Sequence, residues 1–123
     1  MNKIIWFTPA VCVFTGILLL STVLSIPIQI EGVGYTDKIS HSFAYFVLTL
    51  SFLLPLYKFN LIDTRNWFLL MIGCSLYGVL LEFVQYSLFP NRYFEWLDAL
   101  SNVSGVLLAS LLFKLTSKYV KKA

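Results

Sequence analysis

The sequence has little charge, little cysteine and a single histidine, and these shortages exclude several classes of protein. Only 12% of its 123 residues are charged, about half the share usual in soluble proteins. Its cysteines, Cys12 and Cys74, stand in separate apolar stretches, so the sequence contains neither a CxxC pair nor a Cys/His zinc motif. Both are predicted to be reduced packing residues. The net charge of +3 is too small to indicate a nucleic-acid partner.

What the chain has instead is apolar sequence. Hydrophobic residues make up 59% of it, and several runs reach the ~20 residues that cross a bilayer. We therefore predict an all-α integral membrane protein with a single domain over residues 1–123. Four transmembrane helices are expected at about 4–26, 38–57, 66–89 and 96–115. Short loops between them favour a compact antiparallel bundle.

The first apolar run could be a transmembrane helix or a cleaved signal peptide, because a positive start such as Lys3 is also typical of a secretory signal peptide. The run is about 23 residues long, which exceeds the usual signal-peptide core, and it has no Ala-x-Ala cleavage pattern. Pro9 falls in its first turns, where a missing N–H costs least, and Pro27 closes it. We predict an uncleaved transmembrane helix.

The placement of lysine and arginine predicts the orientation. If the N-terminus is cytoplasmic, all but two of the nine basic residues lie on the cytoplasmic side, namely Lys3, Lys58, Arg65, Lys114, Lys118, Lys121 and Lys122. Only Lys38 and Arg92 lie on the other side. Positive charge is retained inside, so both termini are predicted to be cytoplasmic.

This topology brings the polar residues of three predicted helices to the outer leaflet. Their spacing places them on shared helix faces: Asp37, His41 and Tyr45 recur every four residues, and Glu82 and Gln85 are three apart. The predicted ligand-binding set is Asp37, Lys38, His41, Tyr45, Glu82, Gln85, Arg92, Asp98 and Asn102. Structural roles also fit some members: Gln85 and Asn102 as interhelical hydrogen-bonding groups, Tyr45 as an interfacial anchor and Asp98 as a helix cap.

Glu82 is the residue that most needs an explanation. It precedes Pro90 by eight residues, which is about 12 Å along a helix. A charged carboxylate at such a depth costs about 2.5–3.5 kcal/mol on insertion scales. Glu82 must therefore be protonated, reached by water, or paired with a cation such as Arg92, Lys38 or His41.

These residues match a pattern that reads Asp37-Lys38-x-x-His41-x-x-x-Tyr45, then Glu82-x-x-Gln85, then Arg92-x5-Asp98-x3-Asn102-x-x-Gly105. In order and spacing the pattern resembles the VanZ-like family of small membrane proteins, from about Asp37 to Ala109. The resemblance implies a multi-pass protein of the bacterial inner membrane. The family's namesake is associated with low-level resistance to the glycopeptide teicoplanin. The resemblance implies no particular reaction.

Three functions remain open at this point, and binding is preferred. A pocket with Lys38, His41 and Arg92 at headgroup level suits an anionic lipid, a prenyl-phosphate carrier, a cell-wall precursor or a lipoglycopeptide. The alternative is an intramembrane lipid-processing enzyme with His41, Glu82 and Asp98 as acid–base groups or metal ligands. No HExxH-like spacing supports the metal, and no resident metal or cofactor is predicted.

The third function is structural. Gly105 and Ala109 form a small-xxx-small pair, a surface that lets another helix approach closely. Through it the chain would assemble with a second copy or with a partner membrane protein.

Overall fold

The computed structural model describes residues 2–22, 36–88 and 96–120, and every regular element within these ranges is a helix. The helices are α1 (Lys3–Trp6), α2 (Thr8–Thr22), α3 (Thr36–Lys58), α4 (Thr64–Leu88) and α5 (Trp96–Val120). The all-α prediction is therefore confirmed over the described residues. The predicted ends at 26 and 89, the loop from 27 and the turn around Pro90 lie outside them.

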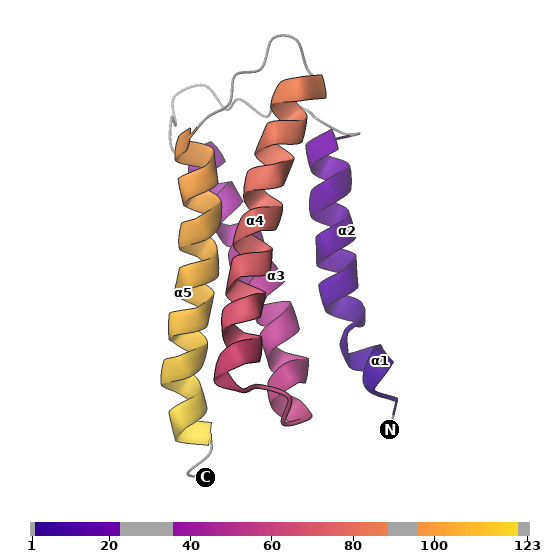
Figure 1. Cartoon of the computed structure of the whole chain (residues 1–123), viewed down its shortest axis with the longest axis vertical. Helices are drawn as coiled ribbons and strands as arrows, with labels where there is room; N and C mark the ends of the chain where they lie inside the picture. The colour runs from indigo at the N-terminus through magenta and orange to yellow at the C-terminus, as the bar shows by residue number, and fades with distance from the viewer. Residues whose placement is uncertain (1, 23–35, 89–95, 121–123) are drawn as a thin grey trace.

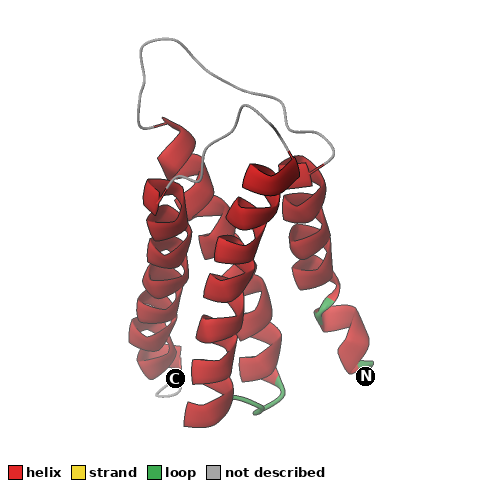
Figure 2. Cartoon of the chain, turned by 45° about the horizontal axis from the view of Figure 1, so that its top comes forward, coloured by secondary structure: helices red, strands yellow, loops and turns green. Residues whose placement is uncertain are grey.

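The four longer helices lie side by side and run alternately in opposite directions (Figure 1). The close packing of α3 against α5 is the most extensive contact between helices. In the view of Figure 2, α4 stands in front, with α3 behind it and α2 and α5 to either side. Consequently the beginnings of α3 and α5 and the end of α4 share one end of the molecule.

Three of the helices are long and apolar enough to cross a membrane: Ile39–Lys58, Thr64–Ser87 and Trp96–Ser117. These three segments indicate a membrane protein. The apolar part of α2, Thr8–Ser21, is shorter, and its 14 residues extend for about 21 Å. A hydrocarbon core is about 30 Å thick, so a fourth span would need residues beyond the described part of α2.

The prediction of one unbroken helix from residue 4 is wrong at Phe7. The chain forms the short α1, turns at Phe7 and starts again as α2 at Thr8. The Phe7 N–H bonds the Ile4 carbonyl at 3.0 Å, a three-residue turn rather than a continuing α-helix. Pro9 supplies the reason, because its ring would clash with the Ile5 carbonyl in a continuous helix.

Burial along the helices differs from that in a soluble protein, because several polar residues are buried while many large apolar residues are exposed. The buried residues include Thr49, Glu82, Gln85, Asp98, Asn102 and Ser110. By contrast, Leu80 and Phe83 on α4 are more than half exposed, as are many other large apolar residues. The core is small and centres on Tyr45, Leu48, Cys74 and Val106. Lipid can solvate the apolar outer surface but not the polar groups, which therefore gather inside.

The described cations gather at the end of the bundle away from the start of α3. The Lys58 ammonium lies over the Trp6 ring, 4.3 Å from its centroid, and Lys3 lies over Phe59 at 5.6 Å. These contacts bring the start of the chain to the end of α3. The described basic residues at this end are Lys3, Lys58, Arg65 and Lys114.

The turn between α3 and α4 is formed by residues whose side chains suit its backbone conformation. Asn60 has a φ of 56°, a conformation that asparagine tolerates better than most residues. The Leu61 N–H bonds the Leu56 carbonyl at 2.8 Å and the Asn60 N–H bonds the Tyr57 carbonyl at 3.1 Å, which is a Schellman cap. Asp63 then caps α4 by accepting the Asn66 N–H at 2.6 Å.

Candidate functional site

Three predicted site residues meet where three helices share one end of the bundle. His41 lies early in α3, Asp98 lies in the first turn of α5, and Glu82 lies late in α4. Glu82 precedes the last residue of α4, Leu88, by six positions, or about 9 Å along the axis. The antiparallel order of the helices therefore brings together side chains that are up to 57 positions apart.

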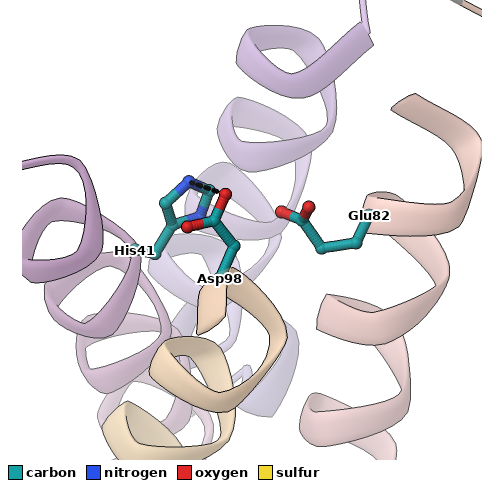
Figure 3. Close-up of side chains that lie close together, drawn as sticks. All are labelled: His41, Glu82 and Asp98. Carbon is teal, nitrogen blue, oxygen red and sulfur yellow. Dashed lines mark ion pairs between the residues drawn. The ribbon is translucent and has the colours of Figure 1, made fainter. Parts of the chain in front are cut away.

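The three side chains point toward one another (Figure 3). The Nε2 atom of His41 lies 3.9 Å from Oδ2 of Asp98, an ion-pair distance when the imidazole is protonated. Each of the three residues offers a nitrogen or oxygen atom within 4.8 Å of those of the other two. We call His41, Glu82 and Asp98 the polar cluster.

Both carboxylates of the polar cluster are buried. The Asp98 side chain is 3% exposed and Glu82 is 4% exposed, whereas the His41 side chain is 20% exposed. Carboxylates so far from solvent retain their charge only where cations, hydrogen-bond donors or metal ions compensate it. His41 is therefore the most exposed member of the polar cluster.

A second polar layer lies one turn deeper and centres on Asn102. This residue is 1% exposed, and its Nδ2 group lies 3.5 Å from the Gly78 carbonyl of α4. A Cβ atom at Gly78 would come within 2.9 Å of the Asn102 Cβ and 3.0 Å of a Tyr45 ring atom. Only glycine leaves room here for the amide and the phenol ring together.

Gln85 connects the site to α2. Its Nε2 group donates to the Ser21 carbonyl at 3.0 Å. Its Oε1 atom and the Oδ1 atom of Asn102 are buried and have no hydrogen-bond partner within the described part of the chain. Gln85 follows Glu82 by three positions, and Asn102 follows Asp98 by four. Each of the two oxygens therefore belongs to a residue one helical turn from a carboxylate of the polar cluster.

The small residue Gly105 sets the distance between α3 and α5. A Cβ atom on Gly105 would overlap the Ser42 carbonyl oxygen and come within 3.1 Å of the Phe46 nitrogen, both of them backbone atoms of α3. The Ser42 and Ser104 hydroxyls lie 3.3 Å apart across the same contact. Ala109 is fully buried. Gly105 thus holds α5 close to α3, one turn below Asn102.

An apolar pocket of about 280 Å³ lies between α2, α3 and α4. It is lined by Phe14, Leu48, Phe52, Leu69, Leu70, Gly73, Cys74 and Tyr77. The Phe14 and Tyr77 rings are stacked with centroids 4.1 Å apart, and the Tyr77 hydroxyl donates to the Phe14 carbonyl at 2.7 Å. Tyr77 precedes Glu82 by five residues, so the pocket begins about 8 Å below the polar cluster.

The structure describes most of the predicted ligand-binding set, and it places Tyr45, Gln85 and Asn102 in the buried layers around the polar cluster. The side chains of Asp37 and Lys38 lie outside the part that the structure describes. Arg92, predicted as a cation for Glu82, also lies outside the described residues. Of the three predicted partners of Glu82, only His41 has a described side chain, and it lies beside Glu82.

Sequence reasoning missed two contributors to the site. Gly78 could have been found, because it lies four residues before Glu82 and so faces the same neighbours. Ser21 carried no signal, because its contribution to Gln85 is a backbone carbonyl, which every residue possesses.

The chain was compared with models of known protein families, with curated proteins and with solved structures, and none of the three comparisons found a match. A functional proposal for this chain therefore depends on its residue pattern and on the geometry of the polar cluster.

Proposed function

We propose that this chain is a multi-pass protein of a bacterial inner membrane, of the VanZ-like type, with four transmembrane helices and both termini cytoplasmic. In this proposal the polar cluster binds the headgroup of a membrane-resident amphiphile at the outer leaflet. The ligands considered are an anionic lipid, a prenyl-phosphate carrier, a cell-wall precursor and a lipoglycopeptide. An effect on teicoplanin susceptibility would follow only for the last two.

The orientation is supported by the separation of the cations from the polar cluster. Lys3, Lys58, Arg65 and Lys114 occupy the end of the bundle opposite His41 and Asp98. Basic residues are retained on the cytoplasmic side of a membrane. The polar cluster would then lie on the outer side, where cell-wall precursors and their lipid carriers are exposed.

The observation that carries the proposal is the convergence of His41, Glu82 and Asp98 inside helices whose outer faces are apolar. Ionisable groups in such surroundings are costly and typically mark a binding or transport site. The apolar pocket below the cluster supports an amphiphile in particular. It offers a place for a hydrocarbon chain whose headgroup lies about 8 Å higher, at the level of Glu82.

We expect conservative changes in the polar cluster to release the ligand without unfolding the protein. Glu82→Gln and His41→Gln keep the size of each side chain approximately but remove a charge or a basic nitrogen. The loss of one charged hydrogen bond costs about 1.5–3 kcal/mol, so retention of the ligand should fall about 10- to 100-fold. Native mass spectrometry of protein extracted with its lipids measures that retention.

Asp63→Asn is the matched control, because Asp63 caps α4 at the opposite end of the bundle and asparagine caps equally well. Gly73→Leu provides a second arm: nothing lies within 4 Å of a Cβ at Gly73, and this residue lines the apolar pocket. We expect leucine there to weaken binding of long-chain ligands more than of short-chain ones. Unchanged retention of every phosphate-bearing lipid by Glu82→Gln and His41→Gln would refute the binding proposal.

A processing reaction is the second candidate, and the contact between His41 and Asp98 favours it. A carboxylate oxygen 3.9 Å from the His41 Nε2 atom can orient the imidazole. With Glu82 nearby, the cluster has the residue types of a general acid and a general base. Incubation with a prenyl-pyrophosphate lipid tests this: we expect water to hydrolyse the P–O–P bond, which releases inorganic phosphate and leaves the prenyl monophosphate, and we expect Asp98→Asn to abolish this release. A lipid that is bound but recovered intact would leave only the binding function.

A further inference from the structure

The polar cluster offers a metal ion one imidazole nitrogen and two carboxylate oxygens. These donors come from three different helices, and all three atoms lie within 4.8 Å of one another. Imidazole and carboxylate together suit Zn²⁺ and Mn²⁺, whereas a thiolate would favour Cu(I). The nearest cysteine along α4, Cys74, precedes Glu82 by eight residues, about 12 Å away along the axis.

The spacing of the donor atoms is close to that around a metal ion. Ligand atoms bound tetrahedrally to zinc at about 2.0–2.2 Å lie about 3.3–3.6 Å apart. His41 Nε2 and Asp98 Oδ2 are 3.9 Å apart, and the widest separation in the cluster is 4.8 Å at most. Movements of about 1 Å at the ends of the side chains are enough to close the set around one ion.

A second observation comes from two polar residues on opposite sides of the cluster: Gln85 lies one turn nearer the end of α4, and Asn102 lies one turn deeper along α5. The Oε1 atom of Gln85 and the Oδ1 atom of Asn102 are buried acceptors with no protein donor among the described residues. Their residues are 4% and 1% exposed and lie one turn from Glu82 and Asp98. Buried acceptors beside a metal site accept hydrogen bonds from metal-bound water, which is a donor that the protein itself does not supply.

We propose that His41, Glu82 and Asp98 bind one divalent ion, Zn²⁺ or Mn²⁺, and that bound water fills the remaining positions and donates to Gln85 and Asn102. Three protein ligands leave at least one position open, as in metal sites that act on a substrate. This inference revises the expectation of no resident metal, which rested on the absence of a motif with ligands at fixed spacing on one helix.

The ion explains how an acidic site could accept an anionic headgroup. A phosphate oxygen placed directly beside Glu82 and Asp98 would be repelled, whereas one bound at the open position of a divalent ion is attracted to it. This role of the ion rests on the proposed function. The binding of the metal itself does not, because it depends only on the three side chains.

The first measurement is the metal content of the full chain, purified in detergent without a polyhistidine tag and dialysed against Zn²⁺ or Mn²⁺. We expect about one ion per chain, and an affinity at least about 100-fold lower in Glu82→Gln and in Asp98→Asn, since even outer-shell changes cost up to that much. Asp63→Asn again serves as the control. It removes a carboxylate at the opposite end and should bind metal as the wild type does.

Co²⁺ gives a readout that loss of folding would not imitate. We expect the wild type to show the visible absorption bands of a Co²⁺ ion held by protein ligands, and His41→Gln to change or lose them while its helical circular dichroism is unchanged. Wild-type protein with well under one ion per chain would overturn the inference. So would full metal content in folded Glu82→Gln and Asp98→Asn variants.

Treatment with a chelator separates this inference from the proposed function. If metal is bound and its removal also releases phosphate-bearing lipids, both are supported. If metal is bound but lipid retention is the same after chelation, the metal site stands and its role in headgroup binding is overturned. If no metal binds and lipid is still retained, the metal inference is refuted and the binding function is supported.

Discussion

Replacing Gly105 by alanine is expected to destabilise the protein by about 3 kcal/mol or more, at the upper end of the usual cost of overpacking. The added methyl group would overlap the Ser42 carbonyl oxygen and lie 2.9 Å from the Ser42 carbonyl carbon. Both are backbone atoms, so no side-chain rotation can relieve the overlap. The helices α3 and α5, which form the most extensive contact in the bundle, must move apart.

Thermal unfolding in detergent micelles, followed by helical circular dichroism, measures this loss. Gly73→Ala is the matched control, because it adds the same methyl group in mid-helix where nothing lies within 4 Å. Alanine is favoured over glycine in a helix by about 1 kcal/mol, so the control should be unchanged or slightly more stable. If Gly105→Ala unfolds at the same temperature as Gly73→Ala, the close contact between α3 and α5 is contradicted.

The same substitution should also affect the site. Gly105, Asn102 and Asp98 lie on one face of α5, so a displacement of α5 from α3 moves Asp98 away from His41. We expect any ligand of the polar cluster to bind more weakly in Gly105→Ala than the loss of stability alone would cause.

The second large effect is expected from removing the polar cluster altogether. The triple variant His41→Leu, Glu82→Met and Asp98→Leu replaces the cluster with apolar side chains of similar size. Replacing buried ionic groups in this way is often neutral or stabilising by about 1–4 kcal/mol. We expect the triple variant to be at least as stable as the wild type and to lose binding of headgroup and metal completely.

This result would distinguish a site from a structural cluster. The single variant Asp98→Leu is the control, because it leaves the buried Glu82 and the partly buried His41 without the carboxylate beside them. It should be less stable than the triple variant, since removing one member of a buried charged group is destabilising. Thermal unfolding compares the three proteins. If the triple variant is the least stable, the cluster holds the bundle together, as expected if the chain is only an assembly module.

The sequence by itself determined the helical class of this protein. Its predicted boundaries at 38, 57, 66 and 96 lie within two residues of the observed ones, whereas α5 continues to Val120 instead of ending near 115. Runs of about 20 apolar residues admit few structures other than membrane-crossing helices, because lipid leaves no partner for an open backbone. The break at Phe7 was missed, since the helix restarts before the proline that causes it. The cap at Asn60 and Asp63 was predictable because such turns use only local interactions.

The candidate site was predictable only as a list of polar residues at one end of the helices. Helical spacing showed which of them share a face, and the number of helix reversals showed which end they share. The sequence could not show that polar atoms of His41, Glu82 and Asp98 lie within 4.8 Å of one another. That distance depends on how closely α3, α4 and α5 pack, and the packing depends on Gly105 against Ser42 and Gly78 beside Asn102 and Tyr45.

The sequence thus determined which side chains could bind a ligand or transfer a proton, because an apolar chain contains few polar and ionisable residues. The tertiary structure decided which of them meet. Contacts between residues far apart in the chain depend on backbone approaches of a few ångströms, and these are set by packing rather than by local propensity. The convergence of one imidazole and two carboxylates, on which the proposed metal site and the proposed headgroup site both depend, is therefore a property of the folded bundle alone.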